Sequence, residues 1–220
     1  MQSKPPAAMP WTAIGLPLAL LGPGAVALLS QRLATDPETA APRAFSLALF
    51  VALLLAVVLI ARHGERLSLR ALGFAGSSWL SLPLAVALAA FFVVLYGPTV
   101  QAVLAALSLG GFDEGIARLR TLPHWYLVLA IVVVAAGEEW LYRAYAIERL
   151  EALTGNPFLA ASLSLGAFVL VHLPFWGPGA ALSTGVAGAI LTGLYLWRRD
   201  ILMLVLAHVA TNITGIALAA

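Results

Sequence analysis

The chain consists of long apolar runs without charged residues, separated by short segments that hold its acidic and basic residues. A helix that crosses a bilayer needs about 20 mostly apolar residues, so runs of this length predict membrane-spanning helices. The runs are Pro5–Gln31, Ala44–Ala61, Ala71–Phe112, Thr121–Gly137, Ala152–Trp197 and Ile201–Ala220.

Two of these runs are longer than one helix requires. Ala152–Trp197 has room for two helices, with Pro174 and the turn sequence Gly177-Pro178-Gly179 between them. Ala71–Phe112 holds either one long helix or two helices that break at Gly97-Pro98. The pattern therefore predicts about seven membrane-spanning helices, with eight as the alternative.

The composition agrees with a membrane protein. Hydrophobic residues make up 62% of the 220 residues, charged residues make up 10%, and the mean hydropathy is +0.98. Soluble domains hold about 45–50% apolar and about 25% charged residues. We therefore expect an all-α integral membrane protein with one membrane domain. Residues 1–120 are expected to be anchoring helices, and residues 121–220 to be the helical core that carries the polar groups.

Basic residues outside the apolar runs predict the orientation. With seven helices, one side of the membrane collects more of them than the other, and that side is expected to be cytoplasmic. The larger group is Lys4, Arg62, Arg66, Arg70, Arg143, Arg149, Arg198 and Arg199, and the smaller group is Arg32, Arg43, Arg118 and Arg120. This places the N-terminus inside and the C-terminus outside. The net charge of +2 comes from arginines in loops and at helix ends, where they act as orientation signals. A nucleic-acid partner is therefore not needed to explain it.

Adjacent glutamates, Glu138 and Glu139, follow the run Thr121–Gly137, and Arg143 comes four residues after the second. Charges in membrane-like sequence cost several kcal/mol unless they are paired or used, which makes these residues functional candidates. Glu139 precedes Arg143 in the order that favours an ion pair on one helix face. Glu138 lies about 100° further round the helix and can face another neighbour.

Three more polar candidates lie in later apolar runs. Phe168 and His172 are four residues apart and share a helix face, as do His208 and Asn212. No other polar cluster in the chain combines titratable groups with such apolar surroundings. The last hundred residues therefore contain the candidate chemistry.

Counting along the helices predicts that these residues meet. The sequence Thr154-Gly155-Asn156-Pro157 predicts a tight turn between two antiparallel helices. Glu138 lies 17 residues before the glycine of this turn and His172 lies 17 residues after it. Both are then roughly 25 Å from the turn. His208 lies at a compatible depth, so these residues and Asn212 can form one pocket near the cytoplasmic face.

This set favours hydrolysis of an amide. A poorly solvated carboxylate beside an imidazole can hold and deprotonate a water molecule. A second histidine and an amide side chain can donate to an oxyanion. The sequence lacks the paired intramembrane aspartates of aspartyl proteases, the His-Glu-x-x-His of zinc proteases and the Gly-x-Ser-Gly of rhomboid-like proteases. It has no cysteine, which excludes disulfides and a cysteine nucleophile.

The spacing resembles the CAAX prenyl protease and bacteriocin-processing family of intramembrane glutamic endopeptidases. Its motif Glu-Glu-x-x-x-Arg matches residues 138–143, its motif Phe-x-x-x-His matches residues 168–172, and its motif His-x-x-x-Asn/Asp matches residues 208–212. Each motif alone is weak, but three in this order on separate apolar helices are specific. The resemblance covers roughly residues 124–212.

The resemblance implies a role for each candidate. Glu138 and His172 would activate the water, and His208 and Asn212 would stabilise the oxyanion. The supporting residues would be Glu139, Arg143 and Phe168. The implied partner is a peptide or protein substrate, with prenylated peptides as one class, within membrane lipid. We expect a prokaryotic plasma membrane, a site that opens toward the cytoplasm, and no cofactor.

Other functions stay open at this point. A membrane scaffold or bacteriocin-immunity protein would bind a peptide without cutting it. A metal-dependent hydrolase would use Glu138, His172 and His208 as zinc ligands, because two histidines and one carboxylate form a known catalytic zinc set. A transporter or proton relay would also place glutamate and histidine inside the membrane.

Overall fold

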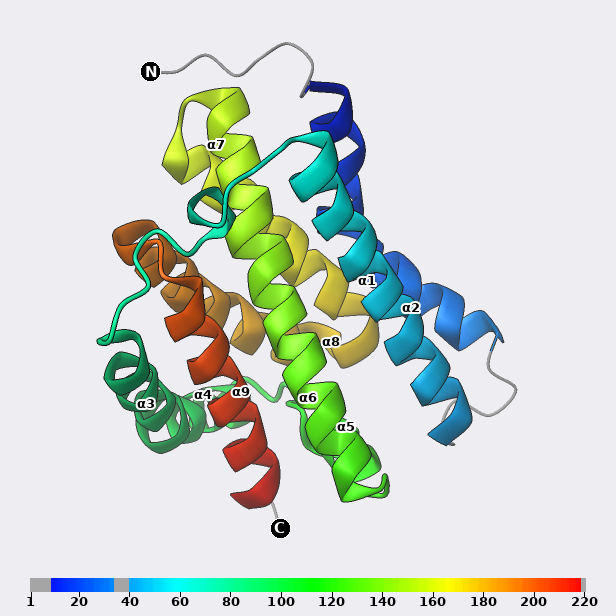
Figure 1. Cartoon of the computed structure of the whole chain (residues 1–220). Helices are drawn as coiled ribbons and strands as arrows, with labels where there is room; N and C mark the ends of the chain where they lie inside the picture. Colours follow the sequence, from blue (N-terminus) through cyan, green and yellow to red (C-terminus); the bar gives the residue numbers. More distant parts are fainter. Residues whose placement is uncertain (1–8, 34–39, 219–220) are drawn as a thin grey trace.

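The computed structural model describes residues 9–33 and 40–218, which form helices and turns without any strand (Figure 1). The long helices are α1 (Met9–Leu33), α2 (Ala40–Leu59) with η2 (Ile60–Gly64), α3 (Ser81–Phe91) with η4 (Phe92–Tyr96) and α4 (Gly97–Ala106), α6 (His124–Glu138) with η5 (Glu139–Ile147) and α7 (Glu148–Thr154), α8 (Pro157–Arg198) and α9 (Ile201–Leu218). The short ones are η3 (Arg70–Leu72) and α5 (Asp113–Leu119). The expected all-α class is confirmed.

In the described ranges, six helices are long and apolar enough to cross a membrane. One of them, α8, is interrupted at Gly177, whose φ of 77° and ψ of 176° are not helical. Its two parts are the two helices expected in the run Ala152–Trp197, and counting them separately gives seven. The helix from α3 to α4 continues through Gly97 with φ of −56° and ψ of −57°. The run Ala71–Phe112 therefore supplies one membrane-spanning helix.

The turn between α7 and α8 forms as its sequence predicts. Gly155 ends α7 in the left-handed conformation, with φ of 69°. The Asn156 side chain then caps α8, because its Oδ1 accepts from the amides of Phe158 and Leu159 at 3.0 and 3.1 Å. Pro157 occupies the first helical position, where no amide hydrogen is needed. This turn sets α6, η5 and α7 antiparallel to the first part of α8.

The segment η5 lies at the centre of the molecule. Every side chain from Leu141 to Ile147 is at most 1% exposed. In Figure 1 the continuous helix of α6, η5 and α7 passes between α1 and α2 on one side and α9 on the other. This helix therefore forms the core around which the candidate residues are arranged.

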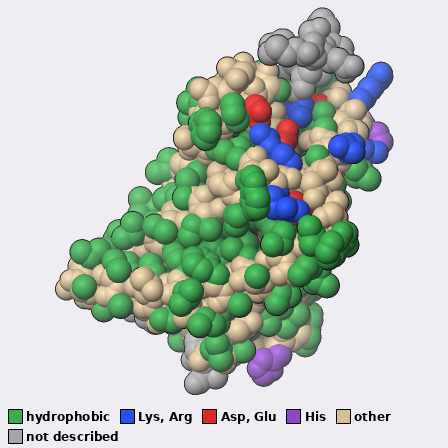
Figure 2. Space-filling view, turned by 90° about the vertical axis from the view of Figure 1, so that its left-hand side faces the viewer, with side chains coloured by type: hydrophobic (Ala, Val, Ile, Leu, Met, Phe, Trp, Pro, Cys, Tyr) green, Lys and Arg blue, Asp and Glu red, His purple; other side chains and the backbone are tan. Residues whose placement is uncertain are grey.

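The outer surface is apolar around the middle and charged at one end. Large exposed hydrophobic side chains occur on every long helix, with Leu21, Leu55, Val94 and Leu170 each at least 57% exposed. Figure 2 shows hydrophobic side chains over most of one face, with acidic and basic side chains gathered toward its upper end. This distribution is that of an integral membrane protein.

Ion pairs and hydrogen bonds join the helices at the end that holds α7. Arg199 donates to Glu148 and to Glu151, both at 2.6 Å. Burial lowers the pKa of Arg199, but the two carboxylates outweigh burial and raise the pKa overall. Arg199 therefore stays charged and holds the start of α7 against the end of α8.

Asp200 should be a strong determinant of stability. Its side chain is fully buried, accepts from Ser77 and Ser81 at 2.9 and 2.7 Å, and caps α9 through the amide of Met203 at 3.2 Å. We expect Asp200→Ala to lower the free energy of unfolding by roughly 2–4 kcal/mol, because a cap and the hydrogen bonds from Ser77 and Ser81 are lost. Denaturation of the purified protein in detergent measures this, and an unchanged midpoint would contradict it.

Candidate active site

The last residue of α6, Glu138, faces His172 on the first part of α8. Glu138 Oε1 lies 3.7 Å from Nε2 of His172, and the two side chains are 15% and 16% exposed. Nδ1 of His172 lies 2.7 Å from the carbonyl oxygen of Phe168, one turn earlier. A carbonyl only accepts, so Nδ1 carries the proton and Nε2 is directed toward the carboxylate.

The next residue, Glu139, points to a different helix. Glu139 Oε1 accepts from Nδ1 of His208 on α9 at 2.8 Å and from Nη1 of Arg143 at 3.3 Å. Glu139 is fully buried and Arg143 is 1% exposed. The ion pair expected between Glu139 and Arg143 is therefore present in the interior, and it also fixes the ring of His208.

The structure thus forms two acid–histidine pairs where the spacing predicted one pocket around Glu138. The carboxylate that bonds His208 is that of Glu139. Asn212 follows His208 by one turn on α9 and is partly buried. Among the described residues, no hydrogen bond is made by the Asn212 side chain.

Phe168 connects the two pairs. The centre of its ring lies 4.3 Å from the guanidinium carbon of Arg143 and 4.6 Å from the ring centre of His172. Tyr142 packs edge-on against it at 5.0 Å. The ring is 4% exposed. Beyond the packing expected of it, Phe168 therefore makes a cation–π contact that links the ion pair of Glu139 to the His172 side of the site.

Gly188 is a site residue for which the sequence predicted close helix packing but no part in the site. Its carbonyl oxygen accepts from Nη2 of Arg143 at 3.4 Å. A Cβ at this position would lie 3.2 Å from that nitrogen and 2.9 Å from Cδ1 of Leu165. The signal in the sequence was a glycine in an apolar helix, which indicates close packing but not the partner.

The π-helical form of η5 was not foreseen either. Nine residues, Glu139–Ile147, adopt it, beginning at the second glutamate. π-helical turns are rare and occur frequently at functional sites. The regular 3.6-residue periodicity used to read the sequence contains no signal for such a turn.

Potential metal ligands do not form a larger group in the described part of the chain. No three His, Cys, Asp or Glu side chains lie close enough together to hold a metal ion there. Glu138 is near His172, and the nearest carboxylate to His208 belongs to Glu139. The zinc alternative requires these pairs to rearrange, and it is addressed by the chelator experiment below.

An apolar hollow of about 610 Å³ lies between α1 and the first part of α8. Leu21, Gly24 and Leu28 line it from α1, and Gly166, Leu170 and Val171 are among the lining residues from α8. Val171 directly precedes His172 in the chain. Adjacent residues of a helix point about 100° apart, and His172 itself is not among the lining residues. The hollow is suited to an apolar group that lies against α1 and α8.

Comparison with known protein families gave a match over residues 120–214, to the family described as Type II CAAX prenyl endopeptidase Rce1-like. This segment contains both acid–histidine pairs, Arg143, Phe168 and Asn212. The match confirms the resemblance to CAAX proteases over the second half of the chain. Comparison with curated proteins and with solved structures gave no significant match.

A methyl group at Gly188 should disturb the Arg143 ion pair. We expect Gly188→Ala to lower the free energy of unfolding by about 1–3 kcal/mol, because the new Cβ overpacks against Leu165 and the guanidinium. Gly193→Ala is the matched control, since no atom lies within 4 Å of a Cβ built there. Thermal melting in detergent checks both variants, and equal melting temperatures would contradict the role given to Gly188.

Proposed function

We propose that this chain, whose residues 120–214 match the CAAX prenyl endopeptidase family, is an intramembrane endopeptidase that uses a water molecule activated by Glu138 and His172. The observation that carries the proposal is the pair of neighbouring acid–histidine contacts. Both histidines are partly exposed, but the carboxylate of Glu138 is partly exposed whereas that of Glu139 is fully buried. The family match supports a membrane-embedded peptide hydrolase of the CAAX type. The residue roles are our assignment.

Glu138 and His172 are suited to hold a water between them. Their 3.7 Å separation is too long for a direct hydrogen bond, and both facing atoms accept protons when His172 is neutral. A water molecule can donate one hydrogen to each. As its oxygen attacks the peptide carbonyl carbon, Glu138 accepts a proton, and a tetrahedral oxyanion forms.

Collapse of that oxyanion completes the reaction. The carbonyl forms again, the carbon–nitrogen bond breaks, and the proton held by Glu138 passes to the leaving amine. The products are a carboxylic acid and an amine, and the carboxylate of Glu138 is regenerated. A residue that takes a proton in the first step and returns it in the second needs a partly desolvated carboxylate, and Glu138 is 15% exposed.

His208 and Asn212 are the proposed donors to the oxyanion. Because Nδ1 of His208 is bonded to Glu139, its Nε2 is the ring nitrogen that can face the oxyanion. A carboxylate partner at Nδ1 also favours a second proton at Nε2, which then becomes a donor. The Asn212 amide, one turn further along α9, can supply a second donor. Each such donor contributes about 3–4 kcal/mol in known oxyanion holes.

Glu139, Arg143 and Phe168 are positioning residues in this account. Glu139 orients His208, Arg143 offsets the buried charge of Glu139, and the Phe168 ring lies between the guanidinium and His172. None of the three needs to touch the substrate. Their effect is to keep the two histidines at fixed positions on different helices.

The apolar hollow between α1 and the first part of α8 supports a lipidated substrate. A prenyl chain attached near the C-terminus of a peptide would lie between α1 and α8, with the peptide next to His172. We further propose that the α7 end faces the cytoplasm of a prokaryotic cell, because basic residues gather there.

Cleavage of a farnesylated CAAX peptide by purified protein in lipid tests the proposed function. Glu138→Gln should lower kcat by at least about a hundredfold, because the amide cannot accept the proton of the attacking water. Wild-type turnover should be unchanged by a metal chelator. Loss of activity in chelator, restored by zinc, would instead favour the metal-dependent reaction. Absence of cleavage by folded wild type would favour a scaffold or immunity protein.

Filling the hollow should affect prenylated substrates selectively. Gly166→Leu places a side chain in the hollow, where a Cβ meets no other atom within 4 Å. We expect a higher KM for the farnesylated peptide and an unchanged KM for the same peptide without the lipid. Gly193→Leu, which lies on the second part of the same helix, serves as the control. An equal change in both KM values would count against a lipid-binding role for the hollow.

A further inference from the structure

Thr211 of α9 lies beside His208 and has no role in the reaction proposed above. It follows His208 by three positions and Ala207 by four, and residues at these spacings are neighbours on one helix face. α9 packs against α6 and η5 (Figure 1). Ala207 and Leu204, one and two turns before Thr211, are both 0% exposed. Thr211 therefore continues the inward face of α9 that contains His208.

The Thr211 hydroxyl is buried and has no hydrogen-bond partner in the described part of the chain. The residue as a whole is partly buried. A helical threonine usually has a partner at hand, because its Oγ1 can bond to a carbonyl oxygen three or four residues earlier. Thr211 uses neither the carbonyl of His208 nor that of Ala207. Its hydroxyl can therefore bond to another molecule.

The depth of Thr211 makes an unsatisfied hydroxyl costly. α9 is one of the helices long and apolar enough to cross a membrane, and Thr211 lies ten residues after its start at Ile201. This places it roughly 15 Å along the helix. Away from water, a polar group without a partner costs free energy, and polar groups at such depth are frequently functional. This favours contact with a substrate over a purely structural role.

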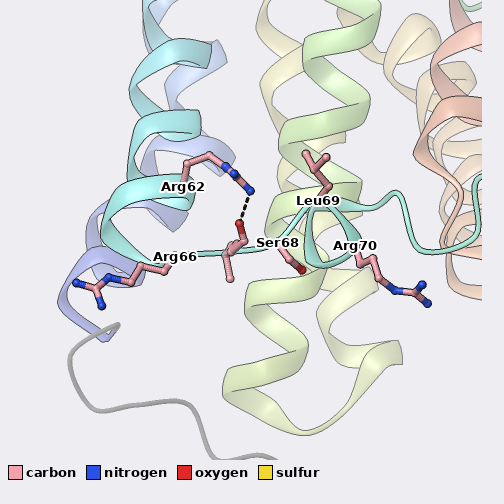
Figure 3. A pocket seen from close by; sticks show the side chains of 6 residues that line it. Arg62, Arg66, Ser68, Leu69 and Arg70 are labelled. Atoms are coloured by element: carbon pink, nitrogen blue, oxygen red, sulfur yellow. Dashed lines mark hydrogen bonds between the residues drawn. The ribbon is translucent and has the colours of Figure 1, made fainter.

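A hollow of about 530 Å³ at the end of η2 shows the contrast. Its Arg62 donates from Nη1 to the carbonyl oxygen of Leu67 at 2.7 Å. Arg66 and Arg70 extend outward on opposite sides of the segment (Figure 3). These three arginines are exposed, so water satisfies them and their donors do not converge on one ligand. The Thr211 hydroxyl is shielded from water and lies next to a histidine of the candidate active site.

A peptide that reaches this site needs polar partners besides the reacting groups. In the hydrocarbon region no water is present to bond its backbone amide and carbonyl groups. The donors assigned above, His208 and Asn212, serve one oxygen only, that of the carbonyl under attack. Backbone groups on either side of the cleaved bond still require partners. A hydroxyl suits them, because it can both donate and accept.

We propose that the Thr211 hydroxyl forms a hydrogen bond with the peptide backbone of the substrate, next to the bond that is cleaved. The inference rests on the proposed function, because it concerns the same site. A contact with an unreactive part of the peptide stabilises the bound substrate and the transition state equally, so it lowers KM and leaves kcat unchanged. Every peptide has this backbone, so the contact serves substrates with and without a lipid.

Binding of a fluorescent CAAX peptide to the full-length protein in detergent tests this contact, with the peptide farnesylated and unmodified. The background is Glu138→Gln, which is expected to bind the peptide without cleaving it. Adding Thr211→Val removes the hydroxyl and keeps the shape of the side chain. We expect Kd to rise roughly three- to tenfold for both peptides, as for the loss of one neutral hydrogen bond. Adding Thr211→Ser, which retains the hydroxyl, should keep Kd within about twofold.

Thermal melting separates this contact from a structural role. Thr211→Val should melt at the wild-type temperature or above it, because no hydrogen bond within the described residues is lost. Thr214→Val is the matched control, since Thr214 is exposed on the same helix, and it should change neither Kd nor the melting temperature. A lower melting temperature for Thr211→Val than for Thr211→Ser would overturn the proposal, because the hydroxyl would then stabilise the fold.

The binding results also distinguish this contact from the proposed reaction. Equal Kd values with and without Thr211→Val would overturn the contact, even if wild type cleaves the peptide. Absence of binding to Glu138→Gln would overturn it too. If Thr211→Val raises Kd but folded wild type cleaves no peptide, the endopeptidase proposal fails and the contact with the peptide stands.

Discussion

The ion pair between Glu139 and Arg143 is the interaction on which the arrangement of the site depends. Both residues lie in the interior, and their carboxylate and guanidinium atoms are 3.3 Å apart. Removal of one partner of such a buried pair typically costs roughly 3–5 kcal/mol, because the other charge is left uncompensated. The surrounding helices must therefore adopt positions that keep the pair intact.

Three other contacts satisfy this pair, and each comes from a different helical segment. His208 donates to Glu139 from α9, the carbonyl of Gly188 accepts from Arg143 in the second part of α8, and the ring of Phe168 covers the guanidinium from the first part. The same ring then lies against His172. Through these contacts, one buried charge pair sets the positions of both histidines relative to η5.

The difference between the two glutamates follows from helix geometry. Adjacent residues point about 100° apart, so Glu138 and Glu139 cannot face the same neighbour. Glu138 faces α8 and stays partly exposed, whereas Glu139 faces α9 and is fully buried. Water can reach the partly exposed carboxylate of Glu138, whereas the buried carboxylate of Glu139 is occupied by Arg143 and His208. This contrast is the physical basis for assigning them different roles.

Much of this arrangement could be predicted from the sequence. The apolar runs predicted the helices, and the turn at Gly155 predicted the antiparallel hairpin. Equal distances from that turn predicted that Glu138 lies level with His172, and the two side chains are in fact 3.7 Å apart. The choice of partner for His208 could not be predicted. Spacing gives depth and face along one helix, but the rotation of α9 relative to η5 depends on packing between helices.

The remaining differences have the same origin. The π-helical turns of η5 and the bond from Arg143 to Gly188 arise from tertiary contacts that no local pattern encodes. Arg149 is a further example. Its position near the turn predicted an exposed, charged side chain outside the membrane, but the side chain is buried beside Glu65.

The most direct test of the account measures turnover and stability together for Glu138→Gln and Glu139→Gln. The account predicts that Glu138→Gln loses kcat on a farnesylated peptide while its melting temperature stays close to that of wild type. Glu139→Gln should lower the melting temperature, because Arg143 is left buried without its charged partner. Wild-type turnover in folded Glu138→Gln would contradict the account, whatever the behaviour of Glu139→Gln.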